Sequence, residues 1–192
     1  DKNESVGGRL TSIEQDGFIF DLGPTWYWMP DVFDKFFNDF NKKTSDYYKL
    51  VRLEPSYKFF ANKCNYDISS NENDLNNMFE SIESGSSIKM KKFMKEAAIK
   101  YKVSMDHFIY KPNLSIREYF SLSVLKYFFS LDLLRSLRNH ISSFFKSKII
   151  KDMLEFPSMF LGGTPKNTPA LYSLMNYADI IGGTWYPMGG MA

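Results

Sequence analysis

Two glycines followed by an arginine, Gly7-Gly8-Arg9, form the segment of this sequence best suited to contact a ligand. Glycine has no Cβ, so the backbone at such a pair can approach a bound molecule closely. The arginine adds a permanent fork of donors that matches phosphate or carboxylate. A second segment, Asp21 to Thr25, follows a short β-like run and contains a further glycine and a proline. Taken alone, this second segment is typical of a turn that ends a strand.

Asp1 stands six residues before the glycine pair. In a dinucleotide-binding fold, an acid that accepts from a ribose hydroxyl follows a G-x-G-x-x-G turn by roughly 20 residues. That turn does not occur in these 192 residues. The pattern therefore predicts a segment that begins one strand into such a fold.

Composition excludes several classes of function. A formal net charge of +2 is too small to indicate a nucleic-acid partner. One cysteine, Cys64, excludes a framework of internal disulfides and fits a reducing compartment. With only His107 and His140 beside it, no metal-ligand spacing exists, and no apolar run is long enough to cross a membrane. The 18 Phe and 12 Tyr indicate either a well-filled core or an extended apolar cavity.

Helical and extended segments are mixed along the chain. Hydrophobic periodicity predicts the helices and strands that would hold the residues of a site in place. The predicted segments are strands at 9–14 and 17–21, a helix from Pro30 to near Asn41, extended chain at 50–60 and 64–69, helices at 74–84 and 87–108, helices within 115–156, and a helix after Pro169. The Phe face of the first helix is expected to face a core rather than a cofactor. The lysines of 89–102 are expected to lie mostly on a solvated face. Pro55 predicts a sheet edge or a bulge.

Residues 115–156 are rich in Leu, Phe and Ile and carry more basic than acidic side chains, with a capping box predicted at Ser115 and Glu118. The acids in this stretch are Glu118, Asp132, Asp152 and Glu155. Basic amphipathic helices with aromatic anchors suit an anionic membrane surface. An ordinary helical subdomain that packs its apolar faces on the rest of the chain is the alternative.

Five blocks in order resemble one protein family. They are the opening D-K-N-E-x-V-G-G-R-L, then G-F-x-F-D-L-G-P-T-W-Y-x-M-P-D-V-F, L-x-P-S-Y, F-L-G-G-T-P-x-N-T-P-A-L-Y-S-L-M-N-Y-A-D and the closing W-Y-P-M-G-G-M. Together they look strongly like the bacterial phytoene desaturase (carotene desaturase) family of FAD-dependent oxidoreductases, within the amine-oxidase-like flavoproteins. The N-terminal dinucleotide turn and the C-terminal flavin segment of that family are absent here. The resemblance therefore implies an internal segment of a longer enzyme, one that is inactive by itself.

The resemblance implies FAD as the cofactor. Asp1 would accept from the ribose hydroxyls, Gly7, Gly8 and Arg9 would lie along the cofactor, and Gly23, Pro24 and Thr25 would approach the flavin ring. The implied reaction removes hydrogen across saturated bonds of a long apolar polyene such as phytoene and passes a hydride equivalent to the flavin, which a quinone or oxygen reoxidises.

The resemblance also implies an apolar tunnel for the substrate, with Trp26, Tyr27, Trp185 and Tyr186 as predicted substrate contacts. No pair of carboxylates stands out as an acid and base. Arg9, Asp21 and Asp179 are the polar residues of the matched blocks and are therefore the candidates for a catalytic role. His107 and His140 are expected to be surface or core residues, and no metal ligand is expected.

The predicted fold class is α/β with an α+β substrate region. Residues 1–30 would belong to a Rossmann-like FAD-binding domain, 31–71 to a substrate-binding region, 72–157 to a helical, membrane-facing subdomain, and 158–192 would return toward the substrate and FAD regions. A cytoplasmic protein bound peripherally to membrane is the expected location.

Two other classes of function remain open at this stage. One is a related flavoenzyme, namely a carotenoid isomerase, a saturase or an amine oxidase. An amine oxidase would be expected to line its site with more polar groups than the Trp26–Trp28 and Trp185–Tyr186 clusters supply. The other is a non-enzymatic amphipathic membrane-binding module, in which the glycine blocks would be incidental.

Overall fold

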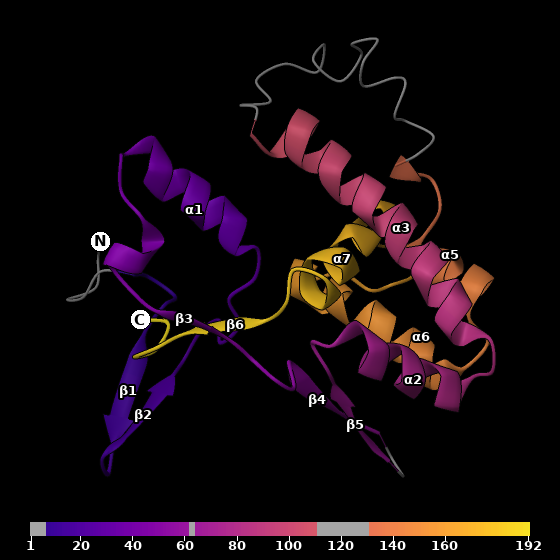
Figure 1. Cartoon of the computed structure of the whole chain (residues 1–192), viewed down its shortest axis with the longest axis horizontal. Coiled ribbons are helices and arrows are strands. Elements are labelled where there is room, and N and C mark those ends of the chain that lie inside the picture. The colour runs from indigo at the N-terminus through magenta and orange to yellow at the C-terminus, as the bar shows by residue number, and fades with distance from the viewer. Residues whose placement is uncertain (1–6, 62–63, 111–130) are drawn as a thin grey trace. The chain divides into compact units, whose positions relative to one another are not determined.

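The computed structural model describes residues 7–61, 64–110 and 131–192, and its chain divides into two compact units (Figure 1). The first unit comprises Asp1–Lys58, Asp67–Ser70 and Gly182–Ala192, and the second comprises Phe59–Tyr66 and Asn71–Ile181. The predicted mixture of helices and strands is confirmed, and the strands among the described residues form three two-stranded sheets. The predicted domain boundaries stay predictions.

The first sheet is the predicted hairpin. Strands β1 (Ser12–Gln15) and β2 (Phe18–Asp21) pair antiparallel, and Gln15 lies opposite Phe18. The two turn residues between them, Asp16 and Gly17, have φ of 53° and 81°. An Asp-Gly pair tolerates two successive positive φ values, and this is the turn geometry that matches the twist of a hairpin.

The second sheet joins segments that are far apart in the chain. Strand β3 (Leu50–Arg52) pairs antiparallel with β6 (Trp185–Pro187), and the two lie side by side in Figure 1. Tyr27 adds a bridge to Trp185, with both backbone N–H···O distances at 3.0 Å. The C-terminal block of the sequence is therefore held between two N-terminal segments.

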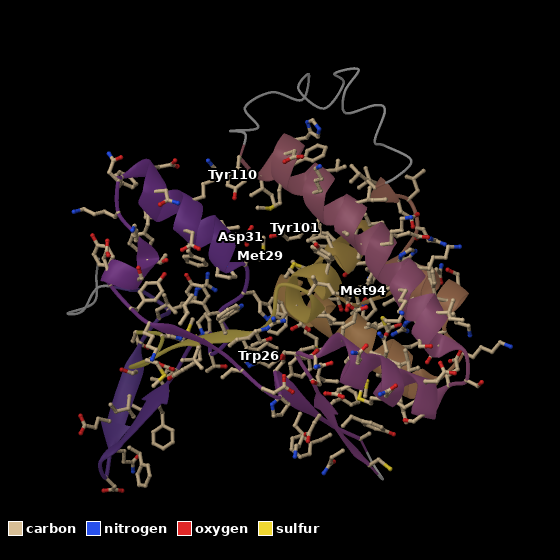
Figure 2. The ribbon with its side chains drawn as sticks, viewed as in Figure 1. Trp26, Met29, Asp31, Met94, Tyr101 and Tyr110 are labelled. Atoms are coloured by element: carbon tan, nitrogen blue, oxygen red, sulfur yellow. The ribbon has the colours of Figure 1, made fainter. Side chains whose placement is uncertain are left out.

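Helix α1 (Pro30–Asp39) confirms the helix predicted from Pro30, although it ends two residues early. Proline at the first helical position needs no hydrogen-bond partner for its nitrogen and fixes a helical φ. Figure 2 shows Met29 and Asp31 at the end where α1 begins. A single 3-10 turn, η1 (Thr44–Asp46), follows it, and the Thr44 hydroxyl donates to Asp34 of the helix.

The third sheet consists of β4 (Tyr57–Phe60) and β5 (Asn65–Ile68), as the extended pattern at 50–60 and 64–69 predicts. Pro55 lies between β3 and β4, outside both strands, because proline cannot donate to a ladder. The carboxylate of Glu54 accepts from the Ser69 hydroxyl at 2.8 Å and from Ser70 N at 2.7 Å. These hydrogen bonds hold the segment that follows β3 against the segment that follows β5.

Apart from Phe59–Tyr66, the described part of the second unit is mainly helical. Its elements are α2 (Glu72–Ile82), α3 (Ser86–Ser104), the π-helical turn η2 (Met105–Ile109), α5 (Leu137–Phe144), α6 (Lys148–Glu155), the 3-10 segments η4 (Phe156–Leu161) and η5 (Ala170–Ser173), and α7 (Leu174–Ile180). Helix α3 packs against α2, α5 and α7, and its Tyr101, labelled in Figure 2, meets Tyr177 of α7 with ring centroids 5.3 Å apart. The helices predicted at 74–84, 87–108 and after Pro169 are confirmed with small shifts at their ends.

Helix α2 begins earlier than predicted because Asn71 caps it. The Asn71 side chain accepts from the backbone nitrogens of Asn73 and Asp74 at 2.9 and 3.3 Å. An amide oxygen at this position satisfies donors that the first helical turn leaves without partners. Gly85, with φ of 76°, joins α2 to α3 rather than simply closing α2.

The expectation of a solvated lysine face is wrong for Lys100. Its side chain is only 3% exposed, and its Nζ donates to Ala170 O at 3.0 Å and to Ser173 Oγ at 3.1 Å. The same nitrogen lies 3.3 Å from His140 Nε2 and 3.7 Å from a carboxylate oxygen of Asp132. A buried ammonium requires such partners. They come from three distant segments, so helix periodicity could not reveal them.

His140 completes this buried cluster and is a core residue, one of the two placements expected for it. Its Nδ1 lies 3.3 Å from Asp132, and Arg135 contacts both the imidazole and that carboxylate. Lys100 and Arg135 can only donate and face Nε2 and Nδ1 respectively, so the ring is neutral and accepts a hydrogen bond from one of them. Burial, then the charges of Lys100 and Arg135, lowers the His140 pKa from 6.5 to about 3.

We therefore expect the second unit to lose stability as the pH falls below about 6.5. The unfolded chain binds a proton at His140 in that range and the folded chain does not, so the loss at pH 5 is about 2 kcal/mol. Thermal unfolding of the full-length protein at pH 7.5 and pH 5 measures it. His140→Gln keeps hydrogen-bonding groups without titrating and should show a clearly smaller difference between the two pH values. An equal difference in both proteins would contradict this role.

The structure describes residues 131–156 of the stretch that was predicted to face a membrane. The predicted cap at Ser115 and Glu118 lies outside the described residues. Within 131–156, basic side chains pair with the acids of the same stretch: Arg135 with Asp132, Arg138 with Glu155 at 2.9 Å, and Lys148 with Asp152 at 2.5 Å. These pairs reduce the net positive charge that a membrane surface would meet. No helix among the described residues is long and apolar enough to span a bilayer.

Candidate functional site

A cavity of about 880 Å³ lies within the first unit. Its lining residues are Leu10, Tyr27, Val32, Phe33, Phe36, Phe37, Tyr47, Tyr48, Pro187, Met188, Gly189, Gly190, Met191 and Ala192. They come from α1 and Tyr27 before it, from the segment after η1, and from the end of β6 and the loop after it, with Leu10 before the hairpin. No charged side chain is among these described lining residues. Sites for small molecules typically measure roughly 300–1,000 Å³ and are mostly apolar.

The Phe face of α1 forms one wall of the cavity. Phe33 and Phe36 are 42% and 59% exposed, and no residue of α1 is buried. The prediction that this face packs into a core is therefore wrong within the described residues. The periodicity correctly indicated an apolar face, but an apolar face does not reveal whether protein or ligand covers it.

The predicted substrate contacts come together, although they do not all face the cavity. The bridge between Tyr27 and Trp185 joins the two aromatic clusters of the sequence. Only Tyr27 lines the cavity. Trp26, labelled in Figure 2, instead stacks on Tyr57 with centroids 5.3 Å apart, and Trp185 Nε1 donates to Gly182 O at 2.9 Å. Alternation along an extended chain explains why Trp26 and Tyr27 point to opposite faces.

The cavity wall includes a hydrogen-bonded pair of phenols, of which the sequence indicated Tyr27 but not Tyr48. The hydroxyl oxygens of Tyr27 and Tyr48 are 2.7 Å apart, and the two rings meet edge to face with centroids 5.9 Å apart. Tyr27 is buried, and burial raises its pKa far above the ordinary value, reinforced by the hydrogen bond to Tyr48. Tyr27 is therefore neutral at any physiological pH.

The two predicted cofactor segments lie against each other. A Cβ on Gly23 would stand 2.0 Å from the carbonyl oxygen of Arg9, so only glycine fits at this position. Gly7 and Gly8 have φ of 111° and 60°. A Cβ on Gly8 would meet no atom within 4 Å, which leaves that face of the backbone open. Arg9 is exposed, and no described carboxylate lies within ion-pair distance of it.

These residues fit a flavin dinucleotide. An open glycine backbone and an exposed guanidinium beside an apolar cavity match a ligand that has both a diphosphate and a planar aromatic ring. Pro24 and Thr25 follow Gly23 on the exposed side of the same turn. Asp1 lies outside the described residues, so its predicted contact with the ribose stays a prediction.

Asp21 holds the C-terminal loop in place. Its two carboxylate oxygens accept from the Tyr186 hydroxyl and from the backbone nitrogen of Met191, each at 3.1 Å. Burial and the hydrogen bond to this carboxylate raise the pKa of Tyr186. Gly189, Gly190 and Met191 all line the cavity. Asp21, predicted as a candidate for catalysis, thus shapes the cavity wall.

We expect Asp21→Ala to loosen this loop without unfolding the unit. The change removes both acceptors, and each neutral donor left without one costs about 1 kcal/mol. The amide of Met191 should exchange with deuterium about tenfold faster in the full-length protein, a change that mass spectrometry of the loop peptide measures. Glu14→Ala, an exposed acid on the neighbouring strand, is the matched control. Unchanged exchange in Asp21→Ala would show that the loop is held by other contacts.

The third candidate for catalysis, Asp179, is in the second unit on α7 and is 2% exposed. Arg9 and Asp21 belong to the first unit. Among the described residues, no cluster of three or more His, Cys, Asp or Glu side chains could hold a metal ion.

The family model for flavin-containing amine oxidoreductases matches residues 1–192. The chain belongs to this family. It is 35% identical over 193 residues to a carotenoid 3,4-desaturase of Haloarcula japonica, covering 100% of this chain and 39% of the relative. It is 30% identical over 192 residues to a zeta-carotene-forming phytoene desaturase of Myxococcus xanthus, covering 100% of this chain and 37% of that protein.

A third relative is the 4,4'-diapophytoene desaturase (4,4'-diaponeurosporene-forming) of Staphylococcus haemolyticus, 28% identical over 192 residues, of which the chain covers 38%. The resemblance to the carotene desaturases that the sequence blocks indicated is thereby confirmed. The chain spans somewhat less than two fifths of the length of these relatives.

Proposed function

We propose that the full-length protein carrying this chain is an FAD-dependent oxidoreductase that removes hydrogen from a long apolar polyene. The observation that supports this most is the cavity, whose described lining is aliphatic, aromatic, thioether and glycine, with no charged group. A hydrocarbon offers no hydrogen-bonding handle, so a site for it must recognise shape and apolar surface. Membership of a flavoenzyme family supplies the redox chemistry, and three relatives carry the names of carotenoid desaturases.

The residues of this chain would bind, orient and shield the substrate. Phe33, Phe36 and Phe37 of α1 offer flat aromatic surface along which an extended apolar chain can lie. The C-terminal loop held by Asp21 forms another part of the wall. The dinucleotide, when bound, would accept a hydride equivalent from the polyene. Gly7, Gly8, Arg9, Gly23, Pro24 and Thr25 would hold it, and residues 1–30 would belong to its Rossmann-like domain.

Arg9 is the residue whose contribution to cofactor binding can be measured directly. Its exposed guanidinium would contribute a charge-assisted contact to the diphosphate. We expect Arg9→Ala to lower the flavin content of the purified full-length protein several-fold, as measured by absorbance of the released cofactor. Unchanged flavin content would exclude Arg9 as a diphosphate ligand.

Product analysis tests the reaction itself. The full-length protein with FAD, given phytoene in liposomes under air, should produce polyenes with more conjugated double bonds, visible as absorption bands at longer wavelength. An isomerase would give the same number of double bonds, and a saturase would give fewer. Oxidation of amines without change in the polyene would favour an amine oxidase, and flavin-independent liposome binding alone would favour the non-enzymatic module.

Membrane contact through the second unit is part of the proposal. Leu134, Met159 and Phe160 are 91%, 68% and 53% exposed there, and an apolar substrate has to be drawn from a bilayer. A peripheral association of this kind, with a quinone or oxygen as electron acceptor, fits the substrate class. Co-sedimentation of the full-length protein with liposomes should fall when Met159 and Phe160 are both changed to Ser.

A further inference from the structure

A second cavity, of about 270 Å³, lies wholly within the second unit. Helices α2, α3 and α7 surround it, and α3 packs against both of the others. An apolar cavity of roughly 150 Å³ is large enough to bind benzene. This cavity is larger than that, but much smaller than the cavity of about 880 Å³ in the first unit. Its size suits one slender apolar chain.

The lining of this second cavity is mostly apolar. Met90, Met94 and Ala98 follow one another at intervals of four residues and therefore lie on one face of α3, where Figure 2 labels Met94. The other apolar lining residues are Leu75, Tyr177, Ile180 and Ile181. Methionine side chains are flexible and polarisable, so they can adapt to a hydrocarbon chain.

Two lysines line the same cavity. Lys91 and Lys95 are exposed and four residues apart, which places them on the same side of α3. Lys89 of this helix pairs with Glu83 at 2.6 Å. Within residues 7–61, 64–110 and 131–192, by contrast, neither Lys91 nor Lys95 has an ion-pair partner. Two ammonium groups beside an apolar cavity are placed to receive the anionic head of an apolar chain.

The charge of the lining indicates which kind of head group fits. Glu72 is the one acid among the described lining residues, so together with the two lysines it leaves a net charge of +1. A carboxylate carries a single negative charge, whereas a phosphate monoester carries nearly two at neutral pH. One slender chain with one negative charge describes a long-chain carboxylate. A phospholipid would bring a second chain, for which this cavity has no room.

We propose that this cavity binds a long-chain carboxylate, with its chain along Met90, Met94 and Ala98 and its head group between Lys91 and Lys95. Lysine is a compact charge on a flexible stem, so two of them can reach one carboxylate without a fixed geometry. The site is separate from the cavity of the first unit. The inference goes beyond the proposed function and does not depend on it.

Calorimetric titration of the full-length flavoprotein with dodecanoate and with dodecanol tests the role of the charge. Lys91→Gln combined with Lys95→Gln removes both ammonium groups and keeps polar side chains of similar length. Two ion pairs at an exposed rim together change affinity by about tenfold. We therefore expect the double variant to bind dodecanoate about tenfold more weakly and to bind dodecanol as before.

Hydrogen exchange of the same protein shows where dodecanoate binds. A ligand held between α2, α3 and α7 slows the local opening of these helices. We expect dodecanoate to protect peptides of these three helices and to leave α1 unchanged. Protection of α1 without protection of α3 would place the ligand in the first unit and overturn the inference.

Two further comparisons control for general effects. Lys92→Gln combined with Lys102→Gln removes the same charge from exposed positions of α3 outside the cavity lining and should leave dodecanoate affinity unchanged. Ala98→Phe places a ring in the cavity and should abolish binding of both ligands. Its matched control is Ile99→Phe, since Ile99 is 45% exposed and is not among the lining residues. If Ala98→Phe does not fold, the two lysine variants still decide the matter.

Three other results would overturn the inference. One is the absence of dodecanoate binding to the unmodified protein. Another is an equal loss of affinity in the two lysine double variants, which would indicate general attraction to a basic helix. The third is unchanged dodecanoate affinity in the Lys91 and Lys95 variant together with weaker binding to phosphatidylglycerol vesicles, which would assign these lysines to a bilayer surface. None of these measurements uses turnover of a polyene, so the proposed function is tested separately.

Discussion

Gly23→Ala is expected to abolish flavin binding by the full-length protein. The added Cβ would lie 2.0 Å from the carbonyl oxygen of Arg9 and 3.1 Å from its carbonyl carbon. Both atoms are backbone, so no side chain can rotate away, and the two predicted cofactor segments would have to separate. A clash that moves backbone costs at least about 3 kcal/mol, which corresponds to a loss of over a hundredfold in flavin affinity.

The matched control for this change is Gly17→Ala in the neighbouring hairpin turn. Gly17 also lies in an exposed turn of the first unit, but a Cβ there would meet no atom within 4 Å. Its φ of 81° makes alanine costly by about 1 kcal/mol through backbone strain alone. Flavin titration of both purified variants measures the contrast. Normal flavin affinity in Gly23→Ala would show that the contact between Gly23 and Arg9 does not shape the cofactor site.

Phe36→Asp is expected to lower kcat/KM for a polyene by at least about thirtyfold, because it places a charge on the cavity wall and removes apolar surface that would contact the substrate. Stability should change little, since Phe36 is 59% exposed. Steady-state rates with phytoene in liposomes, together with thermal unfolding, separate the two effects.

Phe40→Asp is the control on the same helix. Phe40 is 64% exposed, its ring centroid is 5.2 Å from that of Phe36, and it is not among the cavity-lining residues. We expect it to change kcat/KM less than threefold. Equal losses in both variants, accompanied by equal loss of liposome binding, would mean that α1 uses its Phe face for membrane contact instead of substrate.

Local features of the fold could be predicted from the sequence because their causes are local. The Asp16-Gly17 pair specifies the hairpin turn, and Pro30 followed by an amphipathic pattern specifies α1. The pairing of β3 with β6 could not be predicted in this way, because it joins residues more than 130 positions apart through backbone bonds that any side chain permits. The bridge from Tyr27 to Trp185 has the same origin.

The candidate site was predictable in its residue types more than in the role of each residue. The glycines, Arg9 and Asp21 were found from sequence blocks, but only the structure shows that Gly23 is required by the approach of Arg9 and that Asp21 holds the C-terminal loop. Tyr48 and the Phe face of α1 were missed as site residues because their function depends on what surrounds them. Lys100 was misassigned for the same reason, since its partners come from distant segments.

The most direct test of the central claim is an anaerobic single turnover with the full-length protein. Phytoene in liposomes is mixed with flavin-loaded enzyme in the absence of oxygen and quinone, and the spectrum is followed. We expect the flavin absorbance to bleach while a more conjugated polyene band grows in equal molar amount. A bound flavin that stays oxidised, with the polyene unchanged, would contradict a desaturase acting through this cavity.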